Sequence, residues 1–497
     1  MTVTTTGVLP DEVYDVVVVG AGVVGAAITR ELTRYDLRIA FMDAADDVGD
    51  GTSKANTAIL HTGFDAVPGS LESRLVREGQ RRLAAYAEES GIPVEPVGAL
   101  LVAWDDEQLA ALPRLMEKAE RNHCHDTRVI GPEEVYRREP ALGPGALGAL
   151  TVPGESVICP WTTTLAYATQ AVRGGADLHL NCRVERVSSG SPHELTTVRG
   201  RLRTHVLINA AGLYADDLDR QLGHTDFTVT PRRGQLMVFD TFARDLVRHI
   251  LLPVPTALGK GVLVAPTVYG NVLLGPTAED LTDRTATHSS AEGLAFLRAK
   301  GRRIVPALLD EEVTAVYAGL RAATEEDDYR IRCHPGQRYV TVGGIRSTGL
   351  TASMAIAAHV VELLTEAGEE LGEPRTLDPV TMPYLGRTSP RPYERPELIA
   401  ADPEYGRLVC HCERVSRGEI RDALTATVPA RSLEGLRRRT RARAGRCQGF
   451  HCGAAVLALL STDSPVTPSP VTPSPDTTGA PVRSDGGAPP LRPEAGS

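Results

Sequence analysis

Three glycines between an apolar segment and a helix-compatible segment constrain the fold of this chain more than any other feature. The apolar run 14–19 leads into the glycines, and the segment 23–35 follows them with residues typical of helices; the glycines are Gly20, Gly22 and Gly25. This order predicts a β-α-β unit: a buried strand, a glycine turn, a helix and a second apolar run. Glycines at this spacing allow a tight turn, the close approach of a pyrophosphate and close packing of helix on strand.

An acidic residue closes the second predicted strand. Asp43 follows Gly25 by 18 residues, where a carboxylate can accept hydrogen bonds from an adenosine ribose. The combination predicts a dinucleotide site, although the motif alone does not separate FAD from NAD. A later apolar run, 206–210, ends close to Gly212 and is either a second segment that approaches the cofactor or a core strand that ends in a turn.

The order of the remaining segments predicts the domain organisation. Strand-like and helical runs alternate from residue 12 to about 385, which indicates an α/β body with a Rossmann-like βαβ domain and a second, mixed-sheet domain for the substrate. Residues 386–405 contain four prolines and are expected to form an extended linker. A small helical domain is expected at 406–460. The segment 461–497 repeats Pro, Ser and Thr and is expected to be a disordered tail.

Charge and hydropathy exclude several classes of protein. The formal net charge of -10 gives no general attraction to nucleic acid. The longest apolar stretch, 16–28, contains the three glycines and is too short for a membrane span. The N-terminus lacks the pattern of a secretory signal. We therefore expect a cytoplasmic protein without a transmembrane segment.

Four of the eight cysteines are clustered near the C-terminus. Cys410 and Cys412 form a C-x-C pair, and Cys447 and Cys452 form a second pair further along. Clustered cysteines in a cytosolic chain favour a metal over disulfides. Four thiolates suit a [2Fe-2S] cluster or a structural zinc, and the C-x-C spacing favours the cluster because it is uncommon in zinc ribbons.

Several short motifs, weak singly but specific in this order, resemble the D-amino-acid-oxidase-like flavoprotein superfamily. The resemblance covers most of residues 12–365 and is greatest to the FAD-dependent glycerol-3-phosphate oxidases and dehydrogenases and the L-2-hydroxyglutarate oxidases. The matching segments are 52–56, 60–63, 232–235, 253–256, 259–261, 275–277, 318–321 and 343–353.

The resemblance implies an FAD site and a catalytic histidine. FAD would occupy the first β-α-β unit, with further contacts from Ser53, Asn56, Gly212, Gly344, Gly349, Leu350 and Thr351. His61 matches the family histidine beside the flavin, where a neutral imidazole could take the hydroxyl proton. The alternative for His61 is a core histidine with satisfied hydrogen bonds.

Two cations match positions that face the anionic end of the substrate in such enzymes. These are Lys260 and Arg321, and a guanidinium suits phosphate or carboxylate; either could instead be a solvated or structural charge. Arg346 lies where some relatives have lysine and is a weaker candidate. The chain also departs from the family after Arg321, where alanine replaces a frequent proline.

The C-terminal cysteine pattern resembles the bacterioferritin-associated-ferredoxin-like [2Fe-2S] domain. Such a domain is fused to the catalytic subunit of anaerobic glycerol-3-phosphate dehydrogenases. The resemblance implies a protein or quinone-linked electron acceptor, and partner subunits could attach the enzyme to a membrane. The six arginines between 437 and 446 would compensate an anionic cluster or form a solvated basic helix.

These features together predict oxidation of a small anionic alcohol, sn-glycerol 3-phosphate, with FAD and a [2Fe-2S] cluster as cofactors. An L-2-hydroxy acid such as L-2-hydroxyglutarate is the first alternative, since Arg321 and Lys260 would bind a carboxylate as well. Amine oxidation on the same scaffold is a second alternative. A non-catalytic electron-transfer or iron-sensing module is the alternative from another class.

Overall fold

The β-α-β unit predicted around the glycines is present. The computed structural model describes residues 3–9, 12–255 and 261–461. Strand β2 (Val13–Val19) leads through the glycine turn into helix α1 (Val23–Leu32), and strand β3 (Ile39–Met42) follows. β2 pairs in parallel with β3 on one side and with β13 (Gly200–Asn209) on the other. The glycine turn therefore lies at the carboxyl edge of a parallel sheet, where dinucleotides bind.

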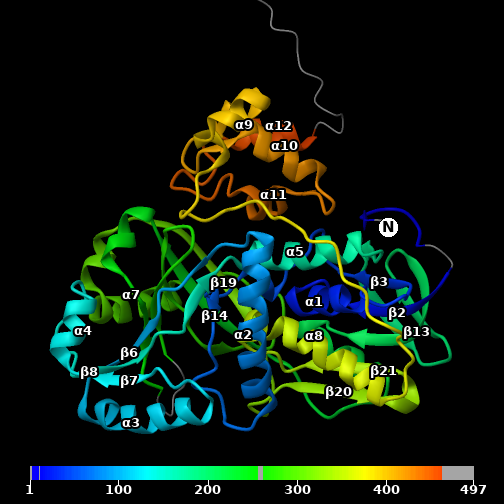
Figure 1. Cartoon of the computed structure of the whole chain (residues 1–497), viewed down its shortest axis with the longest axis horizontal. Coiled ribbons are helices and arrows are strands. Elements are labelled where there is room, and N and C mark those ends of the chain that lie inside the picture. Colours follow the sequence, from blue (N-terminus) through cyan, green and yellow to red (C-terminus); the bar gives the residue numbers. More distant parts are fainter. Residues whose placement is uncertain (1–2, 10–11, 256–260, 462–497) are drawn as a thin grey trace, which may run out of the picture. The chain divides into compact units, whose positions relative to one another are not determined.

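The first sheet is completed by further strands on both sides of this parallel centre (Figure 1). Helix α1 packs against α5 and α8 beside it, and the apolar side chains of these helices form the main core with those of β2 and β3. The other strands are β1 (Val3–Thr4), β10 (Asp177–His179), β11 (Val184–Ser188), β12 (His193–Thr197), β20 (Arg330–His334) and β21 (Tyr339–Gly343).

The second sheet is mixed, as predicted. β15 pairs in parallel with β6, whereas the other pairs are antiparallel. The two longest neighbours are β14 and β19, whose register pairs Arg232 with Arg321. Its strands are β6 (Ala99–Ala103), β7 (Arg128–Ile130), β8 (Gly148–Val152), β14 (Thr230–Phe239), β15 (Ile250–Pro253), β16 (Leu263–Pro266), β17 (Val272–Gly275), β18 (Glu279–Asp280) and β19 (Val313–Ala323).

A small third sheet joins segments that are distant in the sequence. β9 (Ser156–Ile158) pairs antiparallel with β4 (Ile59–Leu60) and with β5 (Val94–Glu95). The helices of the α/β body are α2 (Leu71–Ser90), α3 (Asp106–Arg121), α4 (Pro132–Arg138), α5 (Pro160–Arg173), α6 (Ala215–Gln221), α7 (Ala291–Ile304) and α8 (Gly349–Glu366). Across the described ranges of the chain, none of the helices has the length and apolar character needed to cross a membrane.

The segment expected to be an extended linker is partly helical. Within and just after residues 386–405, the chain forms α9 (Pro396–Ala401) and two 3-10 turns, Pro392–Glu394 and Pro403–Gly406. Each of the three begins with a proline in its first turn. Proline is tolerated there because the first amides of a helix have no partner within it. The proline density therefore marks helix starts as well as extended chain.

The C-terminal residues form a small, mainly helical domain with a core of its own. A short hairpin of β22 (Leu408–Cys410) and β23 (Val415–Ser416) precedes α10 (Arg417–Thr425), α11 (Leu433–Thr440) and α12 (Gly453–Ser461). Ile420, Leu436 and Val456 from the three helices pack against Cys410 and Cys452. The predicted tail lies outside the described residues, apart from Ser461.

Candidate active site

The glycine turn is packed so closely that two of its three glycines admit no side chain. A Cβ on Gly25 would lie 1.9 Å from the carbonyl oxygen of Gly20, and a Cβ on Gly20 would lie 2.3 Å from the carbonyl oxygen of Ala210. Gly20 also has φ of +110°, which favours glycine. Gly22 is the N-cap of α1, so the first amides of the helix are directed at the space above the turn.

The loop after β3 is tied to this turn by three hydrogen bonds. The amide of Gly49 donates to the carbonyl oxygen of Ala21 (2.9 Å), and the amide of Val23 donates to Ser53 Oγ (2.9 Å). Asp43 accepts from the amide of Ala21 (2.8 Å). Burial raises the pKa of Asp43, partly offset by hydrogen bonds from backbone amides.

A single cleft of about 2110 Å³ runs from the glycine turn to the second sheet. Its volume is large enough for a dinucleotide and a small substrate together. Most of the predicted site residues line it: Gly20, Gly22, Gly25, Asp43, Ser53, Asn56, His61, Gly212, Arg321, Arg346, Gly349 and Leu350. Lys260 lies outside the described residues.

Two predicted cofactor residues lie behind the wall of the cleft. Thr351 is fully buried, and its hydroxyl accepts a hydrogen bond from the amide of His61 (3.0 Å). Gly344 has φ of +66° in the turn after β21, where a Cβ would lie 3.1 Å from Arg330 Cγ. Thr351 therefore positions the histidine backbone, and Gly344 shapes the turn.

His61 is held by a buried glutamate. Its Nδ1 lies 3.0 Å from Oε2 of Glu155, whose side chain is fully buried. The other carboxylate oxygen, Oε1, accepts hydrogen bonds from the amide and the hydroxyl of Thr62 (2.7 and 2.8 Å). With Nδ1 donating its proton to the carboxylate, neutral His61 carries its lone pair on Nε2.

The pairing of β4 with β9 explains this contact. Leu60 lies opposite Ser156 in the antiparallel register, so the next residue, His61, lies beside Glu155. Because these two residues are 94 positions apart, the sequence motifs gave no signal for Glu155. Only the pairing of the two strands identifies it.

Arg321 is a largely desolvated cation on the wall of the cleft. Its Nη2 donates to the carbonyl oxygen of Thr277 (2.8 Å). Burial and the neighbouring charge of Arg232 lower the pKa of Arg321 to about 10, and within the described ranges no carboxylate forms an ion pair with it. A Cβ on Gly234 would lie 2.4 Å from Arg321 Nη2, so a glycine on β14 makes room for the guanidinium. The site suits an anion.

Arg346, the weaker candidate, is already paired. It contacts Glu72 (3.1 Å) and Asp327. These two carboxylates compensate its charge within the protein. Arg321 is therefore the better placed of the two for an anionic substrate.

The four clustered cysteines meet as two pairs of thiols. Cys412 contacts Cys447, and Cys410 contacts Cys452. Backbone amides of His451, Gly449 and Phe450 point at Cys447 and lower its pKa, the His451 amide most of all. In the described part of the chain, no three His, Cys, Asp or Glu side chains converge as ligands of one ion would. Two pairs suit a binuclear cluster, in which each iron takes two protein sulfurs.

Comparison with known proteins decides the family. Residues 15–363 match the family described as FAD dependent oxidoreductase, and residues 408–462 match the BFD-like [2Fe-2S] binding domain. The chain belongs to the FAD-dependent oxidoreductases.

Individual relatives of this oxidoreductase cover most of its length. It is 35% identical to the glycerol 3-phosphate dehydrogenase of Caloramator mitchellensis, over 90% of this chain and 94% of that protein. It is 25% identical to the mitochondrial L-2-hydroxyglutarate dehydrogenase of Arabidopsis thaliana, over 70% of this chain and 83% of that protein. Among solved structures, the L-alpha-glycerophosphate oxidase of Mycoplasma pneumoniae with FAD bound has a TM-score of 0.68 and 29% identity, covering 74% of this chain and 96% of that one.

The oxidoreductase binds FAD, and its C-terminal domain binds a [2Fe-2S] cluster. The residues present fit both groups. The glycine turn, the N-terminus of α1 and Asp43 offer the donors and the acceptor that a dinucleotide requires. The paired thiols, with amides directed at Cys447, offer four sulfurs to a cluster.

Proposed function

We propose that this oxidoreductase converts sn-glycerol 3-phosphate to dihydroxyacetone phosphate. The observation that carries the proposal is the presence of His61 and Arg321 on the walls of one cleft that begins at the glycine turn. A base and an anion-binding cation beside a flavin site match a small alcohol that carries a phosphate. The 35% identical glycerol 3-phosphate dehydrogenase supports this substrate.

His61 acts as the base in this proposal. Its Nε2 accepts the hydroxyl proton while the carbinol carbon gives up a hydride, so that the C–O bond becomes a carbonyl. When bound, FAD would supply the hydride acceptor at N5, and the cluster would supply a one-electron acceptor. Glu155 fixes the tautomer of His61 (Nδ1 to Oε2, 3.0 Å) and stabilises the imidazolium that forms.

The contacts of FAD are proposed from the same geometry. Asp43 would accept from the ribose, and the start of α1 would face the pyrophosphate. Ser53 and Asn56 would lie near the flavin, because both line the cleft next to the turn. Gly349 and Leu350, at the start of α8, would lie on the opposite side of the flavin.

Electrons would leave through the C-terminal cluster to a protein or quinone-linked acceptor. The ligands of the cluster would be Cys410, Cys412, Cys447 and Cys452. A cluster with thiolate ligands fits a reducing compartment, and we propose the cytoplasm as the location.

Replacing Glu155 by glutamine should slow flavin reduction by about 10²-fold without loss of FAD. The new amide oxygen can take the hydrogen bonds from Thr62, which turns the amide NH₂ toward His61 Nδ1. The imidazole would then carry its proton on Nε2 and could not accept another one. Stopped-flow absorbance at the flavin band under anaerobic conditions measures the rate. An unchanged rate would show that Glu155 does not set the tautomer.

Replacing Arg321 by lysine should raise KM for glycerol 3-phosphate about tenfold or more, because charge-assisted hydrogen bonds contribute about 1.5–3 kcal/mol and the planar fork is lost. The effect on kcat should be smaller. The matched control is Arg332→Lys, an exposed arginine paired with Asp226, which should leave KM unchanged. Equal effects in both variants would contradict the role of Arg321.

An anaerobic visible spectrum tests the substrate directly. Protein purified without air is mixed with glycerol 3-phosphate or, separately, with L-2-hydroxyglutarate. Bleaching of the flavin band by the first compound alone supports the proposal. Bleaching by the second alone would transfer the assignment to the 2-hydroxy acid, which the relative from Arabidopsis makes the second candidate.

A further inference from the structure

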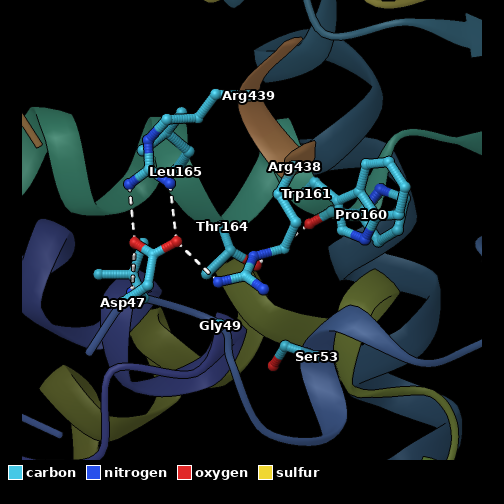
Figure 2. Close-up of a pocket in the computed structure, with 10 residues that line it drawn as sticks. Asp47, Gly49, Ser53, Pro160, Trp161, Thr164, Leu165, Arg438 and Arg439 are labelled. Atoms are coloured by element: carbon cyan, nitrogen blue, oxygen red, sulfur yellow. Dashed lines mark hydrogen bonds and ion pairs between the residues drawn. The ribbon is translucent and has the colours of Figure 1, made fainter. Parts of the chain in front are cut away.

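The C-terminal domain contacts the α/β body through a buried ion-pair cluster. Asp47, in the loop after β3, is 2% exposed, and Arg438 and Arg439 of α11 are 7% and 3% exposed. Figure 2 shows the carboxylate of Asp47 between the two guanidinium groups. Arg439 contacts both oxygens of Asp47 (2.7 Å each), and Arg438 contacts Oδ2 (2.7 Å).

The arginines are fixed from their own side as well. Arg439 donates to the carbonyl oxygens of Val428 (3.1 and 3.2 Å) and Gly435 (2.9 Å). Arg438 makes a second ion pair with Asp50 (2.6 Å). The cavity between the two elements measures about 10 Å³, which leaves room for about one water molecule. A buried bidentate pair of this kind fixes one relative position of two segments.

The same loop forms one wall of the FAD site. Two residues after Asp47, the amide of Gly49 bonds to Ala21 inside the glycine turn. Further along, Ser53 bonds to the first turn of α1 and lines both the small cavity and the large cleft. A continuous series of ion pairs and hydrogen bonds therefore joins α11 to the pyrophosphate-binding turn.

We propose that Arg438 and Arg439 are positioning residues of the FAD site. The docked iron-sulfur domain then strengthens the binding of FAD, and bound FAD stabilises the iron-sulfur domain. The inference rests on the FAD placement proposed above. Neither arginine touches the cofactor in this proposal. They hold Asp47, and the loop of Asp47 holds the glycine turn.

A titration of the flavin-free protein with FAD tests the inference. The full chain with its cluster intact is used, and the quenching of flavin fluorescence gives Kd. Asp47→Asn and Arg439→Ala should raise Kd about tenfold, within the usual range of coupling between two sites. Arg439→Lys keeps the charge and should recover part of the affinity. The control is Arg437→Ala on the same helix, which is paired with Glu434 of α11 and should leave Kd unchanged.

Reciprocity supplies a second measurement that simple damage to the fold would not reproduce. If the coupling exists, saturating FAD must stabilise the C-terminal domain to the same degree. Saturating FAD should slow the loss of cluster absorbance in a chelator several-fold in the wild type and little in Asp47→Asn. No substrate is present, so the result does not depend on glycerol 3-phosphate.

The outcomes separate this inference from the FAD placement. A normal Kd in Arg439→Ala with intact cluster, or an equal rise in Arg437→Ala, would overturn the role of the arginines. If Arg439→Ala gives no folded protein, Arg439→Lys and Asp47→Asn decide in the same way. Asp43→Ala tests the FAD placement. A normal Kd for FAD in Asp43→Ala would overturn both proposals. A raised Kd in Asp43→Ala, with a normal Kd in the Asp47 and Arg439 variants, would overturn only the coupling.

Discussion

Replacing His61 by asparagine is expected to slow the reduction of bound FAD by glycerol 3-phosphate by about 10²- to 10⁴-fold, the usual contribution of a positioned general base. The substrate hydroxyl would then have to lose its proton to water. FAD should remain bound, because the glycine turn and Asp43 lie apart from the histidine in the sequence and are not altered. Rapid-mixing absorbance under anaerobic conditions gives the rate at saturating substrate.

The control is His125→Asn. His125 is exposed and pairs with Glu120, so its loss removes an imidazole without touching the cleft. A His61→Asn variant that reduces flavin at the wild-type rate would exclude His61 as the base and would favour amine oxidation.

Replacing Cys447 by serine is expected to abolish the cluster and, with it, electron transfer to an external one-electron acceptor. Cys447 is one of the four proposed ligands, and the amides directed at it stabilise its thiolate. Flavin reduction by glycerol 3-phosphate should persist when FAD is added in excess. The excess is needed because loss of the metal can loosen a small domain and so weaken the FAD site through α11.

Electron paramagnetic resonance of the reduced protein detects the cluster, and dye reduction measures the transfer. Cys333→Ser is the matched control, since Cys333 lies on β20, away from the cysteine cluster in the sequence. A Cys447→Ser variant that keeps the cluster signal would contradict the ligand assignment. A variant that lacks the signal but still reduces the acceptor at the normal rate would show that electrons leave directly from the flavin.

The parts of the fold that the sequence predicted are those in which local pattern and tertiary role coincide. The run of valines in β2 is buried, and the glycines of the turn follow it directly in the sequence, so the β-α-β unit could be read directly. The starts of short helices at Pro392, Pro396 and Pro403 were hidden, because proline at a helix start and proline in extended chain look alike.

The sequence motifs named candidate residues of the site but not the contacts that support them. His61 stands in a recognisable segment, whereas Glu155 became visible only when β4 and β9 paired. Asp47 and Arg439 are 392 residues apart, and neither has a motif. Single-sequence patterns carry no information on which distant charges meet, so the ion-pair cluster between the domains required the structure.

The proposed base and the proposed anion-binding cation stand on different sheets. His61 and Glu155 flank the small β4-β9 pair, while Arg321 lies on β19 of the large mixed sheet, beside β14. Changes on β14 and β19 can therefore exchange one anionic group for another without disturbing the proton transfer. Because the two groups lie on separate sheets, one scaffold could diversify toward alcohols that carry a phosphate or a carboxylate. The way in which hydrogen is removed would stay the same.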